Sequence, residues 1–229
     1  MKDSNEAGRE EMHYRAVIFD LDGTLLDTIN DIADSMNAAL ERFGFPGHCV
    51  DEYKTFIGDG IEVLARRSLP ADVHAEETVR SCVDAMRDEY AQRWHLTSRP
   101  FAHIPQLLDR LSSMGVGMSV FSNKLDAFTK DMVCALLGSW RFHTVKGLTS
   151  DTPRKPDPEG ALEISRIMRI EPYRCIFVGD SGIDMLTGLR SGMLPVGVLW
   201  GYQDRESLIS NGADTLVSDP LEIPALFRK

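Results

Sequence analysis

The sequence predicts an α/β protein in which a Rossmann-like core with a parallel sheet is interrupted by an inserted, all-helical domain. Through the second half of the chain, short apolar runs alternate with segments of helical periodicity, which is typical of parallel strands joined by right-handed crossovers. Directly after the first strand-like run, by contrast, only helical spacing recurs. With 229 residues and 43% hydrophobic composition, the chain can fill one large core and a small second one.

The first two elements have clear boundaries. Ala16–Phe19 is a short apolar run followed by turn-forming residues, as expected of a buried strand. Apolar residues then recur at helical spacing over residues 32–43, which predicts an amphipathic helix. Asp27 or Thr28 can cap the start of this helix, and Gly44 can end it.

The later elements follow from the same patterns. Helical spacing over residues 79–90 predicts another helix, and residues 53–69 are expected to form a loop followed by a helix. The rest of the chain alternates between strand and helix, with elements expected at 116–121, 126–137, 158–169, 175–178, 183–190 and 195–199.

These elements divide the chain into two domains. The helical stretch of residues 27–98 would be an inserted cap domain, while residues 14–26 and 99–229 would together form the α/β core domain. Residues 1–13 are polar and charged, and we expect a disordered tail there.

Composition narrows the range of partners. A net charge of -10 argues against a sequence-independent grip on nucleic acid, which needs clustered Lys and Arg. The chain has no run of membrane-spanning length, so we expect no membrane partner and a monomer or homodimer acting on a small molecule. A reducing cytoplasm fits best, because the four cysteines are widely spaced and none forms a C-x-x-C pair with another: Cys49, Cys82, Cys134 and Cys175.

Two carboxylates stand two positions apart directly after the first predicted strand, in the sequence Asp20-Leu21-Asp22-Gly23-Thr24. Ligand sites in open α/β sheets lie beyond the carboxyl ends of the strands, so both acids would face that crevice. One carboxylate can act as a nucleophile while the other moves a proton, and the pair would repel without a cation between them. Mg²⁺, which prefers hard oxygen ligands, fits that need. The alternative interpretation is an Asx turn that ends the strand.

Three later segments carry residues suited to phosphoryl transfer. Ser122 and Asn123 offer a hydroxyl and backbone N–H groups to phosphoryl oxygens, although the same pair is ordinary turn chemistry. Lys155 lies in a loop that prolines would stiffen, although a solvated lysine is the default. Asp180 follows a predicted strand, and Asp184, one helical turn later, could either support the site or cap the helix.

In order, these segments resemble the four motifs of the haloacid dehalogenase superfamily: Asp20-Leu-Asp-Gly-Thr-Leu, Ser122-Asn, Lys155-Pro and Gly179-Asp-Ser-x-x-Asp. The resemblance spans nearly the whole chain. Within the superfamily, the chain most resembles the phosphoglycolate phosphatases, through Ile57-Gly58-Asp59-Gly60 followed by Leu64 and Arg67, the fourth motif, and the later Gly201-Tyr202. Thr187 and Ser191 stand where that family often has alanine, which weakens the narrower assignment more than the superfamily.

The resemblance implies a mechanism. Asp20 would be the nucleophile that forms an aspartyl-phosphate, and Asp22 would protonate the leaving alcohol and then activate water. Mg²⁺ would be bound by the Asp20 carboxylate, the Asp22 backbone carbonyl and the Asp180 carboxylate. Asp184 would support the site by orienting Lys155 or a metal-bound water. The residues expected to contact the substrate are Ser122, Asn123, Lys155, Gly23 and Thr24 in the core, and Arg67 in the cap.

We therefore expect a Mg²⁺-dependent phosphatase that hydrolyses a small phosphate monoester, with 2-phosphoglycolate as the first candidate. The second acid, Asp22, disfavours dehalogenation, because a halide leaves without being protonated. An inorganic pyrophosphatase and a β-phosphoglucomutase-type isomerase would use the same residues and stay open as alternatives. A receiver-like signalling domain also uses a phosphorylated aspartate, but the helical insertion and Asp22 argue against it.

Overall fold

The computed structural model describes residues 13–73 and 75–227, and its α/β architecture is the one that the sequence predicts. The described residues form a six-stranded parallel sheet in the order β5-β4-β1-β6-β7-β8. Its strands are β1 (Ala16–Phe19), β4 (Gly117–Leu125), β5 (Val145–Leu148), β6 (Cys175–Gly179), β7 (Leu194–Val198) and β8 (Thr215–Val217). The first strand of the sequence thus lies in the middle of the sheet, flanked by the strands that carry the later motifs.

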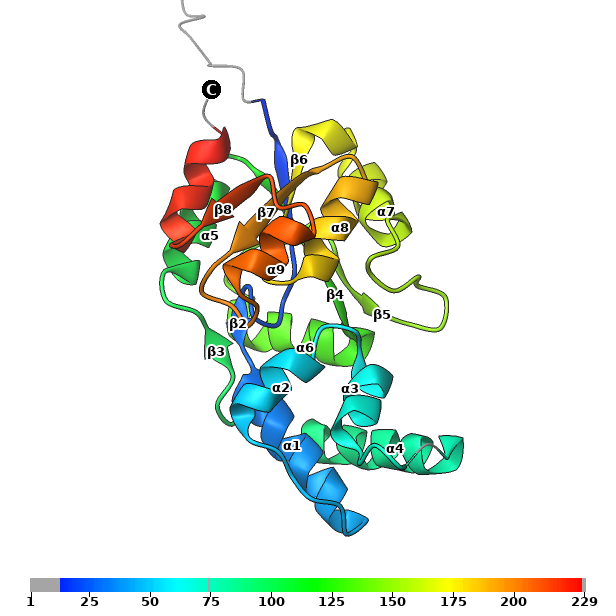
Figure 1. Ribbon diagram of the computed structural model, residues 1–229. Coiled ribbons are helices and arrows are strands. Elements are labelled where there is room, and N and C mark those ends of the chain that lie inside the picture. Colours follow the sequence, from blue (N-terminus) through cyan, green and yellow to red (C-terminus); the bar gives the residue numbers. More distant parts are fainter. Residues whose placement is uncertain (1–12, 74, 228–229) are drawn as a thin grey trace, which may run out of the picture.

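Helices cover both faces of this sheet (Figure 1). The covering helices are α5 (Ile104–Ser113), α6 (Asp126–Leu137), α7 (Glu159–Met168), α8 (Gly182–Arg190) and α9 (Arg205–Ser210), with 3₁₀ helices η1 (Pro172–Arg174) and η2 (Pro220–Phe227). Val17 and Phe19 of β1 share one hydrophobic core with residues of α5, α6 and η2, whereas Ala16 and Ile18 pack with residues of α7 on the opposite face. Burial on both faces explains why β1 is a continuous apolar run.

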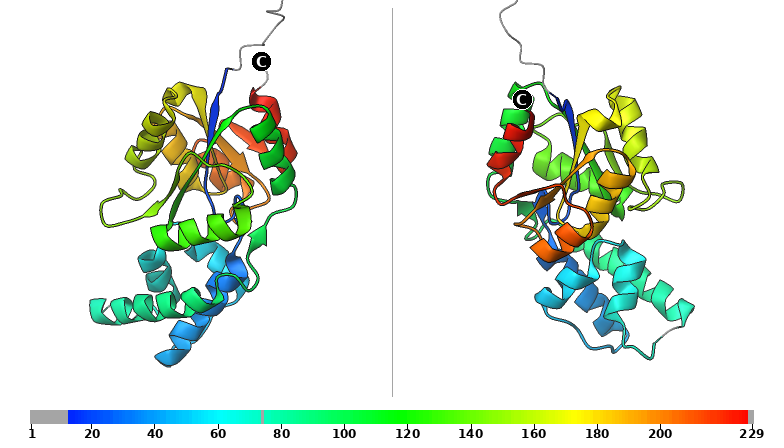
Figure 2. Two further views of the ribbon diagram at one scale, coloured as in Figure 1. Left: turned by 180° about the vertical axis from the view of Figure 1, so that it is seen from behind. Right: turned by 45° about the horizontal axis from the view of Figure 1, so that its top comes forward.

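A separate group of helices lies beyond the carboxyl end of β1, below the sheet in Figure 1 and in both views of Figure 2. These helices are α1 (Ile29–Arg42), α2 (Val50–Phe56), α3 (Ile61–Ser68) and α4 (Glu76–Arg93). We call this group, residues 29–93, the helical insertion. Its helices pack mainly through α1 along α4, and Met36 and Met86 are buried in the same hydrophobic cluster as Val17 and Phe19 of β1.

The chain enters and leaves the helical insertion at one place. β2 (Leu26–Asp27) pairs with β3 (Arg99–Pro100) in an antiparallel two-stranded sheet. Next to it, the buried carboxylate of Asp31 accepts hydrogen bonds from the backbone N–H and the hydroxyl of Thr97 (3.0 and 2.7 Å) and from those of Ser98 (2.8 and 2.7 Å). The two crossing segments are therefore tied together by charge-assisted hydrogen bonds.

The helix expected at residues 32–43 is confirmed, with Thr28 at its N-cap and Gly44 just beyond its end. The loop expected at the start of residues 53–69 is wrong, because α2 already occupies Val50–Phe56. The Glu52 carboxylate accepts the N–H of Cys49 at 2.8 Å, and Tyr53 is fully buried with its hydroxyl bonded to Asn37 at 2.7 Å. Tertiary packing of Tyr53 thus stabilises a helix too short to be recognised by its periodicity.

The tail predicted at residues 1–13 lies outside the described residues except for His13. Among the described helices, none combines the length and the apolar character that crossing a bilayer requires.

Candidate active site

Asp20 directly follows the central strand. Its N–H donates to the carbonyl of Val178 at 2.9 Å, so the pairing of β1 with β6 continues up to the acid. The residue is 8% exposed and lies at the carboxyl end of the sheet. The chain then turns through Gly23, whose φ of 81° lies in the left-handed region that favours glycine. The turn and the strand together fix where the Asp20 carboxylate points.

Lys155 bridges two acids. Its Nζ lies 2.8 Å from Oδ1 of Asp20 and 2.7 Å from Oδ1 of Asp184, and all three side chains are largely buried. Burial alone would lower the pKa of Lys155, but the carboxylates of Asp184 and Asp20 raise it, so the ammonium stays charged. Asn123 fixes the backbone of this loop: its side chain accepts from the N–H of Lys155 at 2.9 Å and donates to the carbonyl of the same residue at 3.1 Å.

Asp180 and Asp184 are placed by the start of α8. Ser181 is the N-cap of this helix and Asp184 reciprocates, its Oδ2 accepting the N–H of Ser181 at 3.1 Å. Asp180, outside this capping box, accepts the N–H of Tyr202 at 2.8 Å. The Tyr202 hydroxyl also accepts the N–H of Thr28 at 2.8 Å, so one residue contacts both the acid and the start of the helical insertion.

The carboxylate of Asp22 points away from this acidic group. Both of its oxygens lie close to Nζ of Lys124, at 2.7 and 2.8 Å, and Oδ1 also accepts the hydroxyl of Thr28 at 2.7 Å. Lys124 also reaches the helical insertion, with Nζ 4.8 Å from the ring centroid of Tyr90. Sequence reasoning missed Lys124, although it directly follows Ser122 and Asn123. Its position directly after the Ser122-Asn123 motif is the signal that could have identified Lys124 as a site residue.

The buried acids suit a divalent cation. Oxygens of Asp20, Asp180 and Asp184 lie within 4.8 Å of one another, and Lys155 is the cation paired with two of them. Burial raises the pKa of Asp20 to about 7, with Lys155 opposing and Asp184 adding to the shift. Burial, followed by the charges of Asp184 and Asp20, raises the pKa of Asp180 well above its ordinary value. Such excess negative charge is relieved when a metal ion binds, and an all-oxygen donor set fits Mg²⁺.

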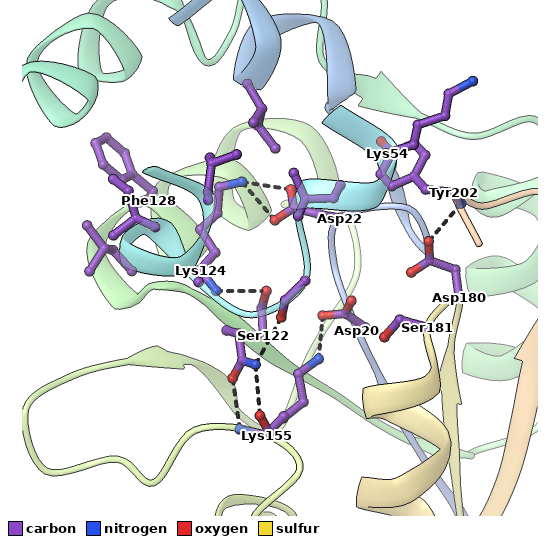
Figure 3. Close-up of a pocket in the computed structure, with 18 of the residues that line it drawn as sticks. Asp20, Asp22, Lys54, Ser122, Lys124, Phe128, Lys155, Asp180, Ser181 and Tyr202 are labelled. Atoms are coloured by element: carbon purple, nitrogen blue, oxygen red, sulfur yellow. Dashed lines mark hydrogen bonds and ion pairs between the residues drawn. The ribbon is translucent and has the colours of Figure 1, made fainter. Parts of the chain in front are cut away.

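A pocket opens above these acids, between the core and the helical insertion (Figure 3). Among the predicted site residues, Ser122 and Asn123 line it together with the acids and Lys155, whereas Asp184 lies beneath them, fully buried. Thr24 lies behind Asp180, with Oγ1 3.4 Å from Oδ1 of that residue. The structure does not bring Arg67 to the pocket. Its guanidinium pairs with Asp59 at 2.7 Å, and Lys54 is the insertion cation among the lining residues.

With this arrangement in view, comparison with known proteins identifies the class. Residues 17–198 match the family model of haloacid dehalogenase-like hydrolases. The chain belongs to this family, and the resemblance seen in the four motifs is confirmed.

Relatives in the family are named for a phosphatase activity. A phosphoglycolate phosphatase of Aquifex aeolicus is 32% identical over 213 residues, which cover 93% of this chain and 96% of the relative. Phosphoglycolate phosphatase 1 of Pseudomonas aeruginosa is 30% identical over 211 residues, covering 90% and 77%. A crystal structure from Lactobacillus delbrueckii subsp. bulgaricus matches with a TM-score of 0.88 and 28% identity, covering 95% of this chain and 100% of that one. The protein is therefore an enzyme, a hydrolase that acts on phosphate esters.

Proposed function

We propose that the protein is a Mg²⁺-dependent phosphatase that hydrolyses a small phosphate monoester through an aspartyl-phosphate on Asp20. The observation that carries this proposal is a contact between two buried charged groups: Nζ of Lys155 lies 2.8 Å from Oδ1 of Asp20, the candidate nucleophile. Two further buried acids, Asp180 and Asp184, lie beside them. A carboxylate held next to a fixed positive charge can accept a phosphoryl group while that charge is neutralised.

In the first half of the reaction, an Asp20 oxygen forms a bond to phosphorus as the ester oxygen leaves. Lys155 and the hydroxyl and backbone of Ser122 and Asn123 stabilise the charge on the phosphoryl oxygens. Asp22 would turn from its contacts with Lys124 toward the leaving group and, as the protonated acid, donate a proton to the departing alkoxide, so that an alcohol is released. The side-chain amide of Asn123 is occupied by Lys155, so its backbone N–H is the group left for the substrate.

In the second half, Asp22 takes a proton from water, the water oxygen bonds to phosphorus, and the bond from phosphorus to Asp20 breaks. Asp184 acts as a positioning residue, because it holds Lys155 against Asp20. Bound Mg²⁺ would supply charge neutralisation and orientation, held by the carboxylates of Asp20 and Asp180 and the backbone carbonyl of Asp22. Gly23 and Thr24 would complete the loop around the phosphoryl group.

We propose 2-phosphoglycolate as the first substrate to test, supported by the names of the relatives. Its carboxylate would need a cation on the pocket wall, and Lys54, which is paired with Asp51 at 2.7 Å, is the cation that the helical insertion places there. Residues 27–98 would act as a cap that closes over residues 14–26 and 99–229 and excludes water. We also propose a cytoplasmic location, in keeping with four cysteines that are all free.

Phosphate release tests the proposal. The panel is 2-phosphoglycolate, pyrophosphate, β-glucose 1-phosphate and an aryl phosphate, each with Mg²⁺ and with EDTA, using wild type and Asp20→Asn. We expect Mg²⁺-dependent release, strongest for 2-phosphoglycolate, and a loss of more than about 10³-fold in Asp20→Asn. Release that persists in the folded variant would exclude Asp20 as the nucleophile. Sugar-phosphate interconversion without net release would indicate a mutase.

A further inference from the structure

The pocket has two chemically different halves. The half at the carboxyl ends of β1, β4 and β6 contains the acids, Ser122 and Lys155, and takes the phosphoryl group in the proposed reaction. The opposite wall comes from the helical insertion and is apolar apart from Lys54. We call it the apolar wall, and it consists of Ile32, Ile57, Ile61, Leu64, Met86 and Tyr90. An ester bound by its phosphoryl group therefore directs its leaving group toward hydrocarbon surface.

The apolar wall continues onto an aromatic pair. The rings of Tyr90 and Phe128 meet edge to face, with centroids 5.1 Å apart, and both residues line the pocket. In Figure 3, Phe128 lies on the far side of Lys124 from Asp20. Aromatic edges and a methionine thioether such as that of Met86 give a surface that suits a ring or a branched alkyl group.

Cations that reach this half already have acidic partners. Nζ of Lys54 lies 2.7 Å from Oδ1 of Asp51, and Lys124 is held by both oxygens of Asp22. Arg67 is paired with Asp59 away from the pocket. A charged leaving group must compete with these pairs and lose water beside hydrocarbon, whereas an apolar leaving group gains from its burial.

We infer that the apolar wall is a leaving-group subsite, and that the enzyme accepts a second class of substrate: phosphate monoesters of compact aromatic or branched aliphatic alcohols. The inference rests on the proposed phosphatase chemistry for turnover, and it adds to 2-phosphoglycolate rather than replacing it. Each methylene that enters the subsite should tighten binding by about fourfold.

Binding of non-hydrolysable phosphonates tests the subsite independently of turnover. Methyl-, ethyl-, butyl- and benzylphosphonate carry the same charged group and differ in hydrocarbon, so calorimetric titration with Mg²⁺ isolates the leaving-group half. We expect the Kd to fall by more than about tenfold from methyl to butyl and benzyl. Phosphate release from methyl, butyl and benzyl phosphate should show the same trend in KM, because the alcohols that leave have similar acidity.

Variants on one helix provide the control. Ile61→Ser alters the apolar wall, whereas Val63→Ser changes a similarly half-buried residue of α3 that does not line the pocket. The ratio of the Kd of methylphosphonate to that of butylphosphonate should be at least threefold smaller in Ile61→Ser than in wild type. In Val63→Ser this ratio should equal that of wild type. Ile57→Ser gives a second test if Ile61→Ser unfolds at a much lower temperature than wild type.

The outcomes separate the two proposals. A Kd that does not fall with hydrocarbon length in folded wild type overturns the subsite, even if 2-phosphoglycolate is hydrolysed. A Kd that falls while no ester releases phosphate overturns the phosphatase and keeps the subsite. The subsite is also overturned if Ile61→Ser and Ile57→Ser, both folded, leave the trend unchanged.

Discussion

Gly23 faces the carboxylate of Asp180 so closely that a Cβ atom at position 23 would lie 2.2 Å from Oδ2 of that acid. The same glycine adopts a φ of 81°, which side chains disfavour. The loop after β1 can therefore approach the predicted metal ligand only with glycine at this position. Gly201 also approaches this acid closely: a Cβ atom at position 201 would lie 2.2 Å from Cβ of Asp180 and 2.5 Å from the carbonyl oxygen of Gly23.

Gly23→Ala should weaken Mg²⁺ binding more than tenfold, because Asp180 must move to admit the methyl group. It should also destabilise the fold by about 1 kcal/mol or more through backbone strain. Gly115→Ala is the matched control, since Gly115 has a φ of 70° but no heavy atom within 4 Å of a built Cβ. Calorimetric Mg²⁺ titration checks the prediction. Equal Mg²⁺ affinity in the two variants would contradict it.

The metal-free protein should lose stability as the pH rises from about 4 to about 7 on account of Asp20. Burial raises the pKa of Asp20 from 3.8 to about 7. In that window the folded state keeps a proton that the unfolded state releases, so the free energy of unfolding falls as pH rises. Below about pH 4, Asp20 is protonated in both the folded and the unfolded state, so it no longer makes the free energy of unfolding depend on pH.

Urea unfolding in EDTA gives the free energy of unfolding of the metal-free protein at each pH. The contribution of Asp20 is the value for Asp20→Asn minus the value for wild type. The difference should grow between pH 4 and 7 and level off above, and saturating Mg²⁺ should stabilise wild type more than the variant. A difference that is constant with pH would show that Asp20 does not titrate in this range.

Lys155→Met should destabilise the protein by about 3–5 kcal/mol, because it leaves two buried carboxylates without their shared cation. Combining it with Asp184→Asn should recover part of the loss, since one of those charges is then removed. Lys146→Met is the control: its ion pair with Glu163 spans 2.7 Å, but that carboxylate is 45% exposed, and the cost should stay below about 1 kcal/mol. Denaturant midpoints compare these variants with wild type and with Asp184→Asn alone, and additive effects in the double variant would argue against the shared-charge explanation.

Arg67→Gln should change kcat/KM for 2-phosphoglycolate by less than about twofold, because Arg67 pairs with Asp59 outside the pocket. Lys54→Gln should raise the KM roughly tenfold if Lys54 holds the substrate carboxylate. Steady-state kinetics of both variants distinguish the two cations. A large effect of Arg67→Gln alone would restore the sequence-based expectation that Arg67 contacts the substrate.

The convergence of the predicted site residues could be anticipated from the sequence because parallel strands align their ends. β1 pairs with β4 and β6, so residues just beyond their buried runs converge without any knowledge of side-chain packing. The strand expected to end before Ser122 instead continues as β4 to Leu125, with a register shift after Phe121. That extension places Lys124 against Asp22, a contact between residues 102 positions apart that no local pattern encodes.

Contacts made by side chains of the helical insertion were harder to predict, because they too depend on packing between distant segments. The orientation of a short helix such as α3 depends on what its buried face meets. The resemblance singled out Arg67, but neither Arg67 nor the adjacent Arg66 lines the pocket. Both are exposed and paired, Arg66 with Glu76 at 2.6 Å.

The paired crossing strands β2 and β3 make the helical insertion exchangeable. Its two ends lie side by side, joined by the register of Asp27 with Arg99, while the residues proposed for phosphoryl transfer lie outside it. A different set of helices could therefore replace residues 29–93 between these strands. Such a replacement would change the leaving-group preference and leave the residues proposed for phosphoryl transfer unchanged. The contacts to rebuild between the helical insertion and the rest of the chain would include Asn123 with the carbonyl of Gly58, Lys124 with the ring of Tyr90, and Asp31 with Thr97 and Ser98.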